Sequence, residues 1–287
     1  MDINIYVLPY DSGRRGERMG AGPMHWIDNG LEDFLRARGH AVQKTIIEAQ
    51  GSFLTEIQTS FDLYRQLAGR IQEDCVGGVV PLVLSGNCGG ALGGVTGLTG
   101  LTGGEVGVAW LDAHGDFNTP DTSTSGFLDG MGLATAAGLG WKSLAKTLPG
   151  FRPVSTANIV HVGGRDFDSG EEQLFVDHRV ARVRADDVRQ YGLTAHLMPV
   201  LDRMRSSVRD VYLHFDVDVL DPAETPANHF PVPGGLYPNE VAEAIRLLRE
   251  RFNLRGMGVA SFDPRCDPHG KTLKAVFDLV AEAFEGR

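Results

Sequence analysis

The sequence predicts an α/β protein whose mainly parallel sheet is covered by helices on both faces. Short apolar runs rich in Val, Ile and Leu alternate with segments of helical period, which is the pattern of a parallel sheet. These runs are nearly continuous rather than interrupted by polar residues, as expected for strands that are buried on both sides. The expected strands are Ile3–Leu8, Gly78–Leu84, Val106–Leu111, Asn158–Val162, Val211–Phe215 and Gly256–Phe262.

Helical periodicity is clear in several segments between and after these strands. The expected helices are Trp26–Arg38, Phe61–Ile71, Asn239–Phe252 and Lys271–Phe284. Asn239 is the expected N-cap of the third helix. We interpret the repetitive segment Gly97–Gly104 as a surface turn without function. No Pro- or Ser-rich spacer, charge block or fixed repeat divides the chain, so we expect a single domain over residues 1–287.

The bulk composition restricts the classes of partner. A net charge of -10 disfavours a nucleic-acid backbone, whose recognition needs clustered Lys and Arg. The sequence has no run of about eighteen uncharged apolar residues, and Met1–Pro9 lacks the features of a signal peptide. The 3 cysteines are an odd number without CxxC spacing, which argues against a disulfide framework. We therefore expect a soluble cytoplasmic protein whose partner is a small molecule, with no binding to nucleic acid or membrane.

Ionisable residues directly follow the strand Val106–Leu111. Because residues two apart at a strand end point to the same side, Asp112, His114 and Asp116 can converge on one volume. Two carboxylates and an imidazole in one volume make a plausible site for a divalent metal. The alternative is a polar loop in which Asp116 and Asn118 cap turns.

A second acidic pair ends the strand Val211–Phe215. Asp216 and Asp218 share a face, and burying two neighbouring carboxylates is costly unless a cation neutralises them. Two such clusters at strand ends predict bound metal ions. His214 lies deeper on the same face, and we interpret it as a hydrogen-bonded core histidine rather than a ligand.

Two glycine-containing loops also follow strands. The loop 163–171 could cap a helix that begins near Gly170, with Asp168 or Ser169 as the N-cap. The turn 85–90 lacks the Lys and Ser/Thr of a P-loop, so a nucleotide site is not expected. Cys88 in this turn would lie at a helix N-terminus, which favours the thiolate. It could be a metal ligand, a nucleophile with His114 as its base, or a small buried residue.

Together these motifs resemble the ureohydrolase family of arginase, agmatinase and formimidoylglutamase. The resemblance rests on Asp-Ala-His-x-Asp-x-Asn followed by Thr119-Pro120 and Thr124-Ser125-Gly126, and on Phe-Asp-Val-Asp-x-Leu-Asp-Pro with Thr225-Pro226-Ala227. It extends from Gly20–Pro23 through Gly256–Phe262. The resemblance implies a three-layer α/β/α fold with a mainly parallel, roughly eight-stranded sheet. It also implies a homo-oligomer, either a trimer or a hexamer.

The resemblance further implies a centre for Mn²⁺, with one or two ions per chain. Asp112 and Asp216 would bridge the ions, and Asp116 would bind the first. His114 and Asp218 would bind the second, and a hydroxide held between the ions would attack the substrate. The groups expected to take part in catalysis are Asp116, His114 and Asp129.

The same resemblance assigns residues to an amino-acid-like substrate. Asn118 and Ser125 match positions that hold a substrate carboxylate in arginases. Asp168, with Glu171 nearby, matches positions that receive the α-amino group. Ser261 lies where the family has a glutamate that pairs with the guanidinium, so the usual cation clamp is missing. Asp263 would face the same side as Ser261, and could replace the clamp, only if side chains continue to alternate along a regular strand there.

Two further positions depart from the family pattern. Cys88 replaces a histidine ligand of the first metal, and an anionic sulfur suits Zn²⁺ or Co²⁺ better than Mn²⁺. This cysteine makes the site similar to that of N-hydroxyarginine hydrolases. Asp129 replaces a histidine that shuttles protons, and an aspartate serves this purpose near neutral pH only if burial raises its pKa.

The expected function is therefore metal-dependent hydrolysis of a C–N bond in a linear amidine, guanidine or hydroxyguanidine through a metal-bound hydroxide. One alternative is hydrolysis of a neutral amide-like substrate, for which Ser261 would offer a hydroxyl. The other is a non-catalytic metal-binding or assembly subunit that keeps the fold.

Overall fold

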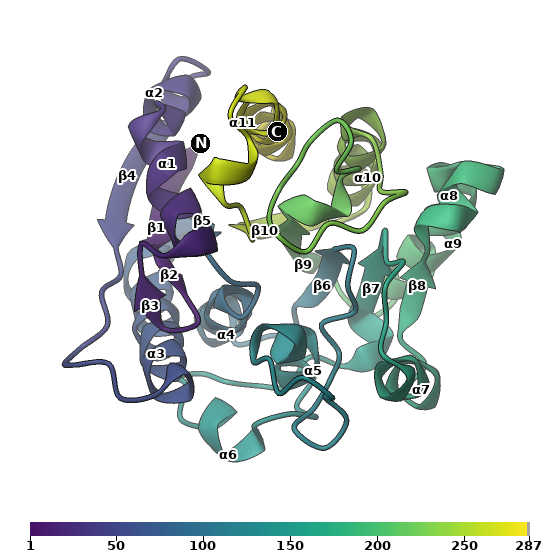
Figure 1. The fold of residues 1–287 in the computed structure, drawn as a ribbon, viewed down its shortest axis with the longest axis horizontal. Helices are drawn as coiled ribbons and strands as arrows, with labels where there is room; N and C mark the ends of the chain where they lie inside the picture. The colour runs from purple at the N-terminus through teal and green to yellow at the C-terminus, as the bar shows by residue number, and fades with distance from the viewer. Residues whose placement is uncertain (286–287) are drawn as a thin grey trace.

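An eight-stranded parallel sheet divides the molecule into two helical layers (Figure 1). The computed structural model describes residues 1–285 of the chain. The strands follow the order β4-β1-β5-β10-β9-β6-β7-β8. Their bounds are β1 Asp2–Leu8, β4 Ala41–Ile46, β5 Val80–Ser85, β6 Gly107–Leu111, β7 Ile159–Val162, β8 Ala181–Val183, β9 Asp210–Asp216 and β10 Asn253–Ala260. A small hairpin of β2 Tyr10–Asp11 and β3 Arg14–Arg15 lies beside it.

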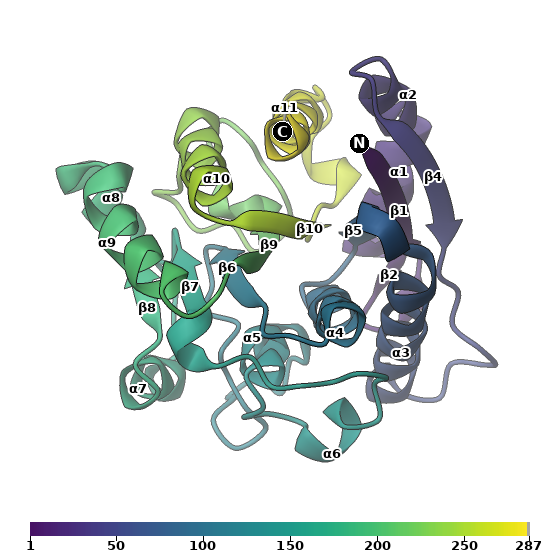
Figure 2. The same ribbon diagram turned by 180° about the vertical axis from the view of Figure 1, so that it is seen from behind.

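The helices fall into two groups on opposite faces of this sheet, as the front and back views show (Figure 2). One layer contains α1 Gly22–Asp28, α2 Leu31–Arg36, α8 Ala185–Tyr191, α9 Leu193–Arg205, α10 Pro238–Arg251 and α11 Lys271–Phe284. The other contains α3 Glu56–Asp74, α4 Gly90–Thr102, α5 Gly132–Ala136, α6 Lys142–Ala145 and α7 Ser169–Asp177. The predicted three-layer α/β/α fold is therefore confirmed.

Strand periodicity decides which residues reach the site. In β9, Leu213 and Phe215 belong to the core beneath α9 and α10, whereas Tyr212 belongs to the core beneath α3 and α4. Because successive side chains alternate between faces, His214 and Asp216 share the Tyr212 side. Trp110 of β6 also belongs to this side. The charged strand ends therefore point toward the layer that contains α4.

The strands that the sequence analysis missed, β4 and β8, are the two edges of the sheet. Ala41–Ile46 has only exposed and half-buried positions, and Ala181–Val183 spans only 3 residues. Neither forms the buried apolar run on which the prediction relied. The bounds of two expected helices also differ from those in the structure. The segment Trp26–Arg38 breaks at Gly30, whose φ of 89° interrupts the helix, and α10 begins at Pro238 with Tyr237, not Asn239, as its N-cap.

The interpretation of Gly97–Gly104 as a surface turn is wrong, because most of this segment lies inside the buried helix α4. Its glycines allow α3 to approach closely. A Cβ atom at Gly97 would lie 2.7 Å from Cβ of Ile71. The repetition of small residues is thus a packing feature.

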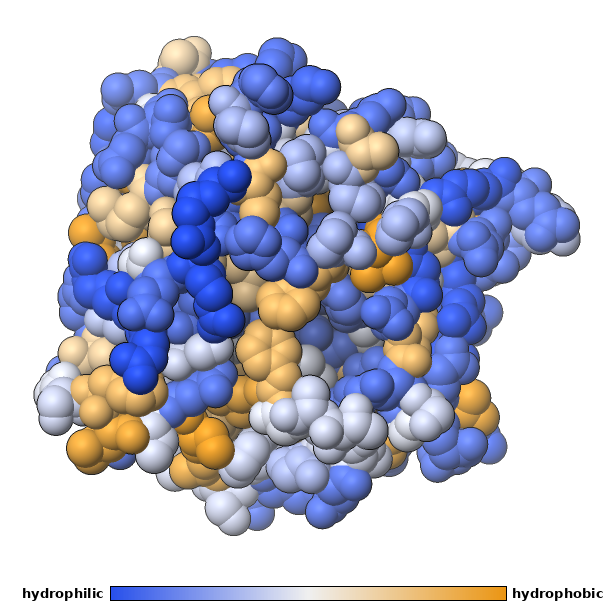
Figure 3. Space-filling view, viewed as in Figure 1, coloured by the Kyte–Doolittle hydropathy of each residue, from blue (hydrophilic) through white to orange (hydrophobic). Residues whose placement is uncertain are grey.

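The described part of the chain contains no helix that is both long and apolar enough to cross a membrane. The face shown in Figure 3 is largely hydrophilic, and hydrophobic residues gather there only in small separate groups. The apolar faces of the helices are turned toward the sheet.

Candidate metal centre

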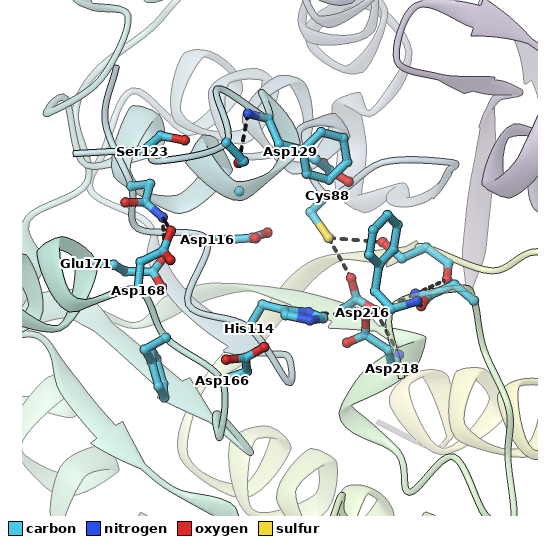
Figure 4. Close-up of a pocket in the computed structure, with 18 of the residues that line it drawn as sticks. Cys88, His114, Asp116, Ser123, Asp129, Asp166, Asp168, Glu171, Asp216 and Asp218 are labelled. Carbon is cyan, nitrogen blue, oxygen red and sulfur yellow. Dashed lines mark hydrogen bonds and ion pairs between the residues drawn. The ribbon is translucent and has the colours of Figure 1, made fainter. Parts of the chain in front are cut away.

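A cavity of about 190 Å³ opens at the carboxyl ends of the central strands (Figure 4). Ligands commonly bind at this edge of an open parallel sheet, and this volume suits a small molecule. The cavity is lined by residues from every motif that the sequence analysis selected. They are Cys88, His114, Asp116, Asn118, Ser125, Asp129, Asp168, Glu171, Asp216, Asp218 and Ser261.

The loop after β6 presents Asp112 and His114. Asp112 is buried and accepts hydrogen bonds from Nε1 of Trp110 at 3.0 Å and from the backbone N–H of His114 at 2.7 Å. A buried residue that the sequence analysis did not single out, His161, donates to the carbonyl of His114 at 2.6 Å. Burial lowers the pKa of His161 to about 3, so the ring is neutral. These contacts fix the direction of the loop.

Asp216 ends β9 and Asp218 lies in the turn that follows it. Asp218 accepts from Nδ2 of Asn228 at 3.0 Å and lies 3.4 Å from Nδ1 of His114. Burial opposes the charge on both groups. Their mutual attraction nevertheless lowers the pKa of Asp218 and raises that of His114.

Cys88 occupies the turn between β5 and α4 and is only 2% exposed. Its Sγ atom lies 2.7 Å from Oδ2 of Asp216, 3.2 Å from Oγ of Ser261 and 3.9 Å from Oδ2 of Asp112. Burial, and then the charge of Asp216, raises the pKa of the thiol well above its usual value. The expected preference for the thiolate is therefore wrong for the metal-free protein, because these effects outweigh the helix N-terminus. His114 is not among these close partners of the thiol.

The electrostatics of the centre fit a divalent cation. Burial raises the pKa values of Asp112, Asp116 and Asp216, and repulsion between neighbouring carboxylates adds to it. Within residues 1–285, Oδ2 of Asp116 is buried without a hydrogen-bond partner. Cations compensate such clusters in folded proteins.

At this edge of the sheet, two groups of potential ligand residues each hold ligand atoms that lie within 4.8 Å of one another. One group is Asp112, His114 and Asp218, and the other is Cys88, Asp112, His214 and Asp216. Asp112 belongs to both groups, and Asp116 belongs to neither.

His214 differs from its expected role. It is 1% exposed and its ring lies 3.7 Å from that of Trp110, between ring centroids. Neither ring nitrogen has a hydrogen-bond partner within residues 1–285, so the prediction of a hydrogen-bonded core histidine is wrong. The sequence did carry one signal that His214 lies near the ligands, because it stands two residues before Asp216 on the same face of the strand.

Asp129 lines the cavity and also holds the turn that contains Cys88. Its carboxylate accepts hydrogen bonds from Nδ2 of Asn87 at 2.8 Å and from the backbone N–H of Gly89 at 3.0 Å. Burial raises the pKa of Asp129 to about 7, against the opposing effect of these two donors. In the metal-free protein, burial thus moves this pKa toward neutral pH.

The far end of the cavity contains the predicted amino-acid-binding residues. Nδ2 of Asn118 donates to Asp168 at 3.0 Å, and the backbone N–H of Phe117 donates to Glu171 at 2.8 Å. Burial raises the pKa of Glu171 to about 7. Asp168 precedes α7 but makes no side-chain cap, so its carboxylate remains directed to Asn118. Figure 4 shows Asp168 and Glu171 together on this side.

Several residues of the cavity wall had no role assigned to them from the sequence. These are Met19, Ser123, Phe127, Gly130, Asp166, Phe167, Asn228 and Phe230. The rings of Phe127 and Phe230 lie 5.9 Å apart, between centroids. They come from separate loops that carry no periodic signal.

Ser261 follows directly after β10 and has a φ of 65°. The regular strand therefore ends before Ser261, and the side-chain alternation on which the sequence analysis depended does not continue. Ser261 lines the cavity, whereas Asp263 forms an ion pair with Arg265 at 2.6 Å. Asp263 does not line the cavity.

The fold and this centre define the class first: a three-layer α/β/α protein whose acidic residues at the carboxyl edge of the sheet fit divalent metal. A family model described as the arginase family matches residues 1–285. The chain belongs to the arginase family and is an arginase-family hydrolase. The resemblance seen in the sequence is thus confirmed at the level of the family.

Individual relatives agree along nearly the whole chain. The chain is 34% identical to an arginase of Bacillus subtilis strain 168, over 97% of its length and 96% of that relative. It is 29% identical to an arginase of Staphylococcus aureus strain MRSA252, over 98% of its length and 96% of the relative. The crystal structure of an arginase from Bacillus subtilis matches with a TM-score of 0.90, at 28% identity, over 100% of this chain and 99% of that one.

Proposed function

We propose that this protein hydrolyses a C–N bond in a small, weakly basic amidine, with an N-hydroxyguanidine that has an amino-acid end as the favoured substrate. The observation that carries the proposal is Asp112, which belongs to two adjacent groups of potential metal ligands. A carboxylate shared in this way is typical of centres that hold two ions.

Two sets of residues would bind the two metal ions. Asp112, His114 and Asp218 would hold one ion, and Cys88 with Asp216 would help to hold the other. Asp216 would also bridge the two ions, as the family resemblance implies, whereas Asp116 lines the cavity beside them. When bound, Mn²⁺, Zn²⁺ or Co²⁺ would activate a water molecule for attack at neutral pH. Asp129 would transfer a proton, because its pKa of about 7 makes both forms accessible.

The amino-acid end of the substrate would lie near α7. Asp168 and Glu171 offer carboxylates to an ammonium group, while Asn118 and Ser125 offer donors to a carboxylate. The hydrogen bond from Asn118 to Asp168 holds a residue for the substrate carboxylate next to a residue for the ammonium group.

The reacting end would lie beside Ser261. A buried guanidinium without a carboxylate partner is costly, whereas a less basic amidine can be bound as a neutral group. Ser261 provides a neutral hydroxyl where a carboxylate would be needed to pair with a cation, which favours substrates of low basicity. The same observation favours a neutral amide-like substrate as the second candidate.

We also propose that the protein is a cytoplasmic homo-oligomer, a trimer or a hexamer, as the family resemblance implies. Its mass in solution, measured by light scattering during gel filtration, would distinguish these two states from a monomer.

The test of the function is a substrate panel at defined metal content. Chelation followed by gel filtration should abolish hydrolysis of N-hydroxy-L-arginine, and added Mn²⁺, Co²⁺ or Zn²⁺ should restore it. Agmatine, guanidinobutyrate, L-arginine and simple amides complete the panel, and Asp216→Ala is the inactive control. Full activity in metal-free protein contradicts the mechanism. Fully loaded protein without any turnover favours the non-catalytic metal-binding or assembly role.

A further inference from the structure

The buried imidazole of His214 lacks any hydrogen-bond partner within residues 1–285, although it is only 1% exposed. An imidazole removed from water without replacement hydrogen bonds loses free energy at both ring nitrogens. Packing against the tilted ring of Trp110 satisfies neither nitrogen. The structure therefore leaves a polar group that needs a partner.

The surroundings of His214 supply the other donors of a metal site. Ligand atoms of Cys88, Asp112, His214 and Asp216 all lie within 4.8 Å of one another. In a tetrahedral site with bonds of 2.0–2.3 Å, neighbouring ligand atoms are separated by about 3.5 Å. The distances from Sγ of Cys88 to Asp216 and Asp112, 2.7 and 3.9 Å, lie on either side of this value.

We infer that His214 is a direct ligand of the first metal ion, together with Cys88, Asp112 and Asp216, and that this position selects Zn²⁺ or Co²⁺ over Mn²⁺. The inference rests on the proposed function, because Asp112 is shared with the second ion. A sulfur, an imidazole nitrogen and two carboxylate oxygens are donors that Zn²⁺ prefers in tetrahedral geometry. Mn²⁺ favours oxygen donors. These dominate the other group, which consists of Asp112, His114 and Asp218.

Charge supports His214 over Asp116 in this position. Once Cys88 binds as a thiolate, Cys88, Asp112 and Asp216 are all anionic, and a further carboxylate would increase their repulsion. An imidazole nitrogen of His214, by contrast, would bind the ion as a neutral donor. Asp116 belongs to neither group, and its carboxylate points into the cavity in Figure 4.

A crystal structure of the full chain loaded with Zn²⁺, with anomalous scattering measured at the zinc edge, tests this directly. We expect one zinc with a nitrogen of His214 at about 2.0–2.1 Å and the sulfur of Cys88 at about 2.3 Å. An ion bound by Asp116 with His214 outside bonding distance overturns the inference. A water molecule hydrogen-bonded to His214 in place of the zinc–nitrogen bond does so as well.

The zinc content of two variants in solution shows whether His214 or Asp116 binds the first ion. His214→Phe keeps the ring packed on Trp110 but removes the ligand, and it should weaken Zn²⁺ at this position by more than roughly the 10–100-fold that loss of an outer-shell partner costs. Asp116→Asn should leave Zn²⁺ content nearly unchanged. The reverse result, with zinc lost in Asp116→Asn and kept in His214→Phe, contradicts the inference. If His214→Phe does not fold, the Asp116→Asn comparison and the crystal structure still decide.

Cobalt provides an independent reading of the sulfur ligand. Co²⁺ bound to Cys88 should show a thiolate charge-transfer band in the near ultraviolet, which Cys88→Ser removes and His214→Phe alters. Cys266→Ser is the matched control, because Cys266 lies in a separate half-exposed group with His229 and Asp263. A band that persists in Cys88→Ser but disappears in Cys266→Ser would overturn the assignment. Zinc at His214 without hydrolysis of any panel substrate would instead refute only the proposed function.

Discussion

At the scale of single residues, the proposed substrate preference depends on Ser261. It places a short hydroxyl beside Cys88, at 3.2 Å, where a charged substrate group would need a carboxylate. Its positive φ turns the chain away from the strand, so that Asp263 is held by Arg265 instead of reaching the cavity. Asp263 therefore does not replace the carboxylate that would pair with a substrate cation.

L-arginine should therefore be a poor substrate, and Ser261→Glu should improve its turnover relative to N-hydroxyarginine. A loss of about 3 kcal/mol in transition-state binding lowers kcat/KM by more than a hundredfold. The measurement is kcat/KM for both substrates in the parent and in Ser261→Glu. Ser261→Gln is the control, because it has nearly the same size without the charge. Parent activity on arginine near the 10⁴ M⁻¹s⁻¹ typical of ordinary enzymes would mean that another group binds the guanidinium.

The sequence was sufficient for those site residues that immediately follow strands. Asp112, Asp216 and Asp218 could be predicted to meet, because parallel strands bring their carboxyl ends to one edge. Asn228 and Phe230 could not, since they lie in a loop whose path no local pattern determines. The need of His214 for a partner was likewise invisible, because it depends on what surrounds the ring in three dimensions.

At the scale of secondary-structure elements, the close contact between α3 and α4 depends on glycines in α4, such as Gly97, because these residues have no side chain. Gly97→Ala should destabilise the fold by about 1–3 kcal/mol, because overpacking outweighs the roughly 1 kcal/mol gain in helix propensity. Its Cβ would lie 2.7 Å from Cβ of Ile71 and 3.2 Å from the carbonyl of Ala68. Urea unfolding of both proteins measures the difference.

Gly104→Ala is the matched control, because a Cβ at this position meets no atom within 4 Å. It should change the free energy of unfolding by less than about 0.5 kcal/mol. Stabilisation by Gly97→Ala would show that the helices pack less closely than described.

Most central elements could be predicted because burial on both faces leaves an unmistakable apolar run. The edges could not, since β4 carries polar residues and β8 is too short to show a pattern. The same limit applies to α4. Its glycines are typical of loops when read locally, and only the close approach of Ile71 explains them.

At the scale of the whole molecule, metal removal should make stability depend on pH. Burial raises the pKa values of Asp129 and Glu171 to about 7, and those of Asp116 and Asp216 well above their usual range. The metal-free folded state therefore holds protons that the unfolded chain releases near pH 4. That stabilisation is complete below the unfolded pKa and is lost as the pH rises through the folded pKa.

The metal-free protein should accordingly lose stability between pH 6.5 and about 8, by roughly 1.4 kcal/mol per pH unit for each group that the folded state still keeps protonated. Buried neutral His161 and His214 have the opposite effect, but chiefly below pH 6.5, where unfolded histidines become charged. Thermal unfolding of chelated and Mn²⁺-loaded protein across this range provides the comparison. Parallel curves for the two forms would show that the carboxylates do not share protons in the metal-free state.

The contacts of Trp110 also give the centre an optical reporter. Its indole donates to Asp112 at 3.0 Å and packs against His214. One fluorophore therefore touches Asp112, which both ligand groups share, and His214 of the group that contains Cys88. The other two tryptophans, Trp26 and Trp141, are not among the residues that line the cavity. Intrinsic emission from Trp110 can therefore follow the filling of the centre in unlabelled protein, with Trp110→Phe supplying the background.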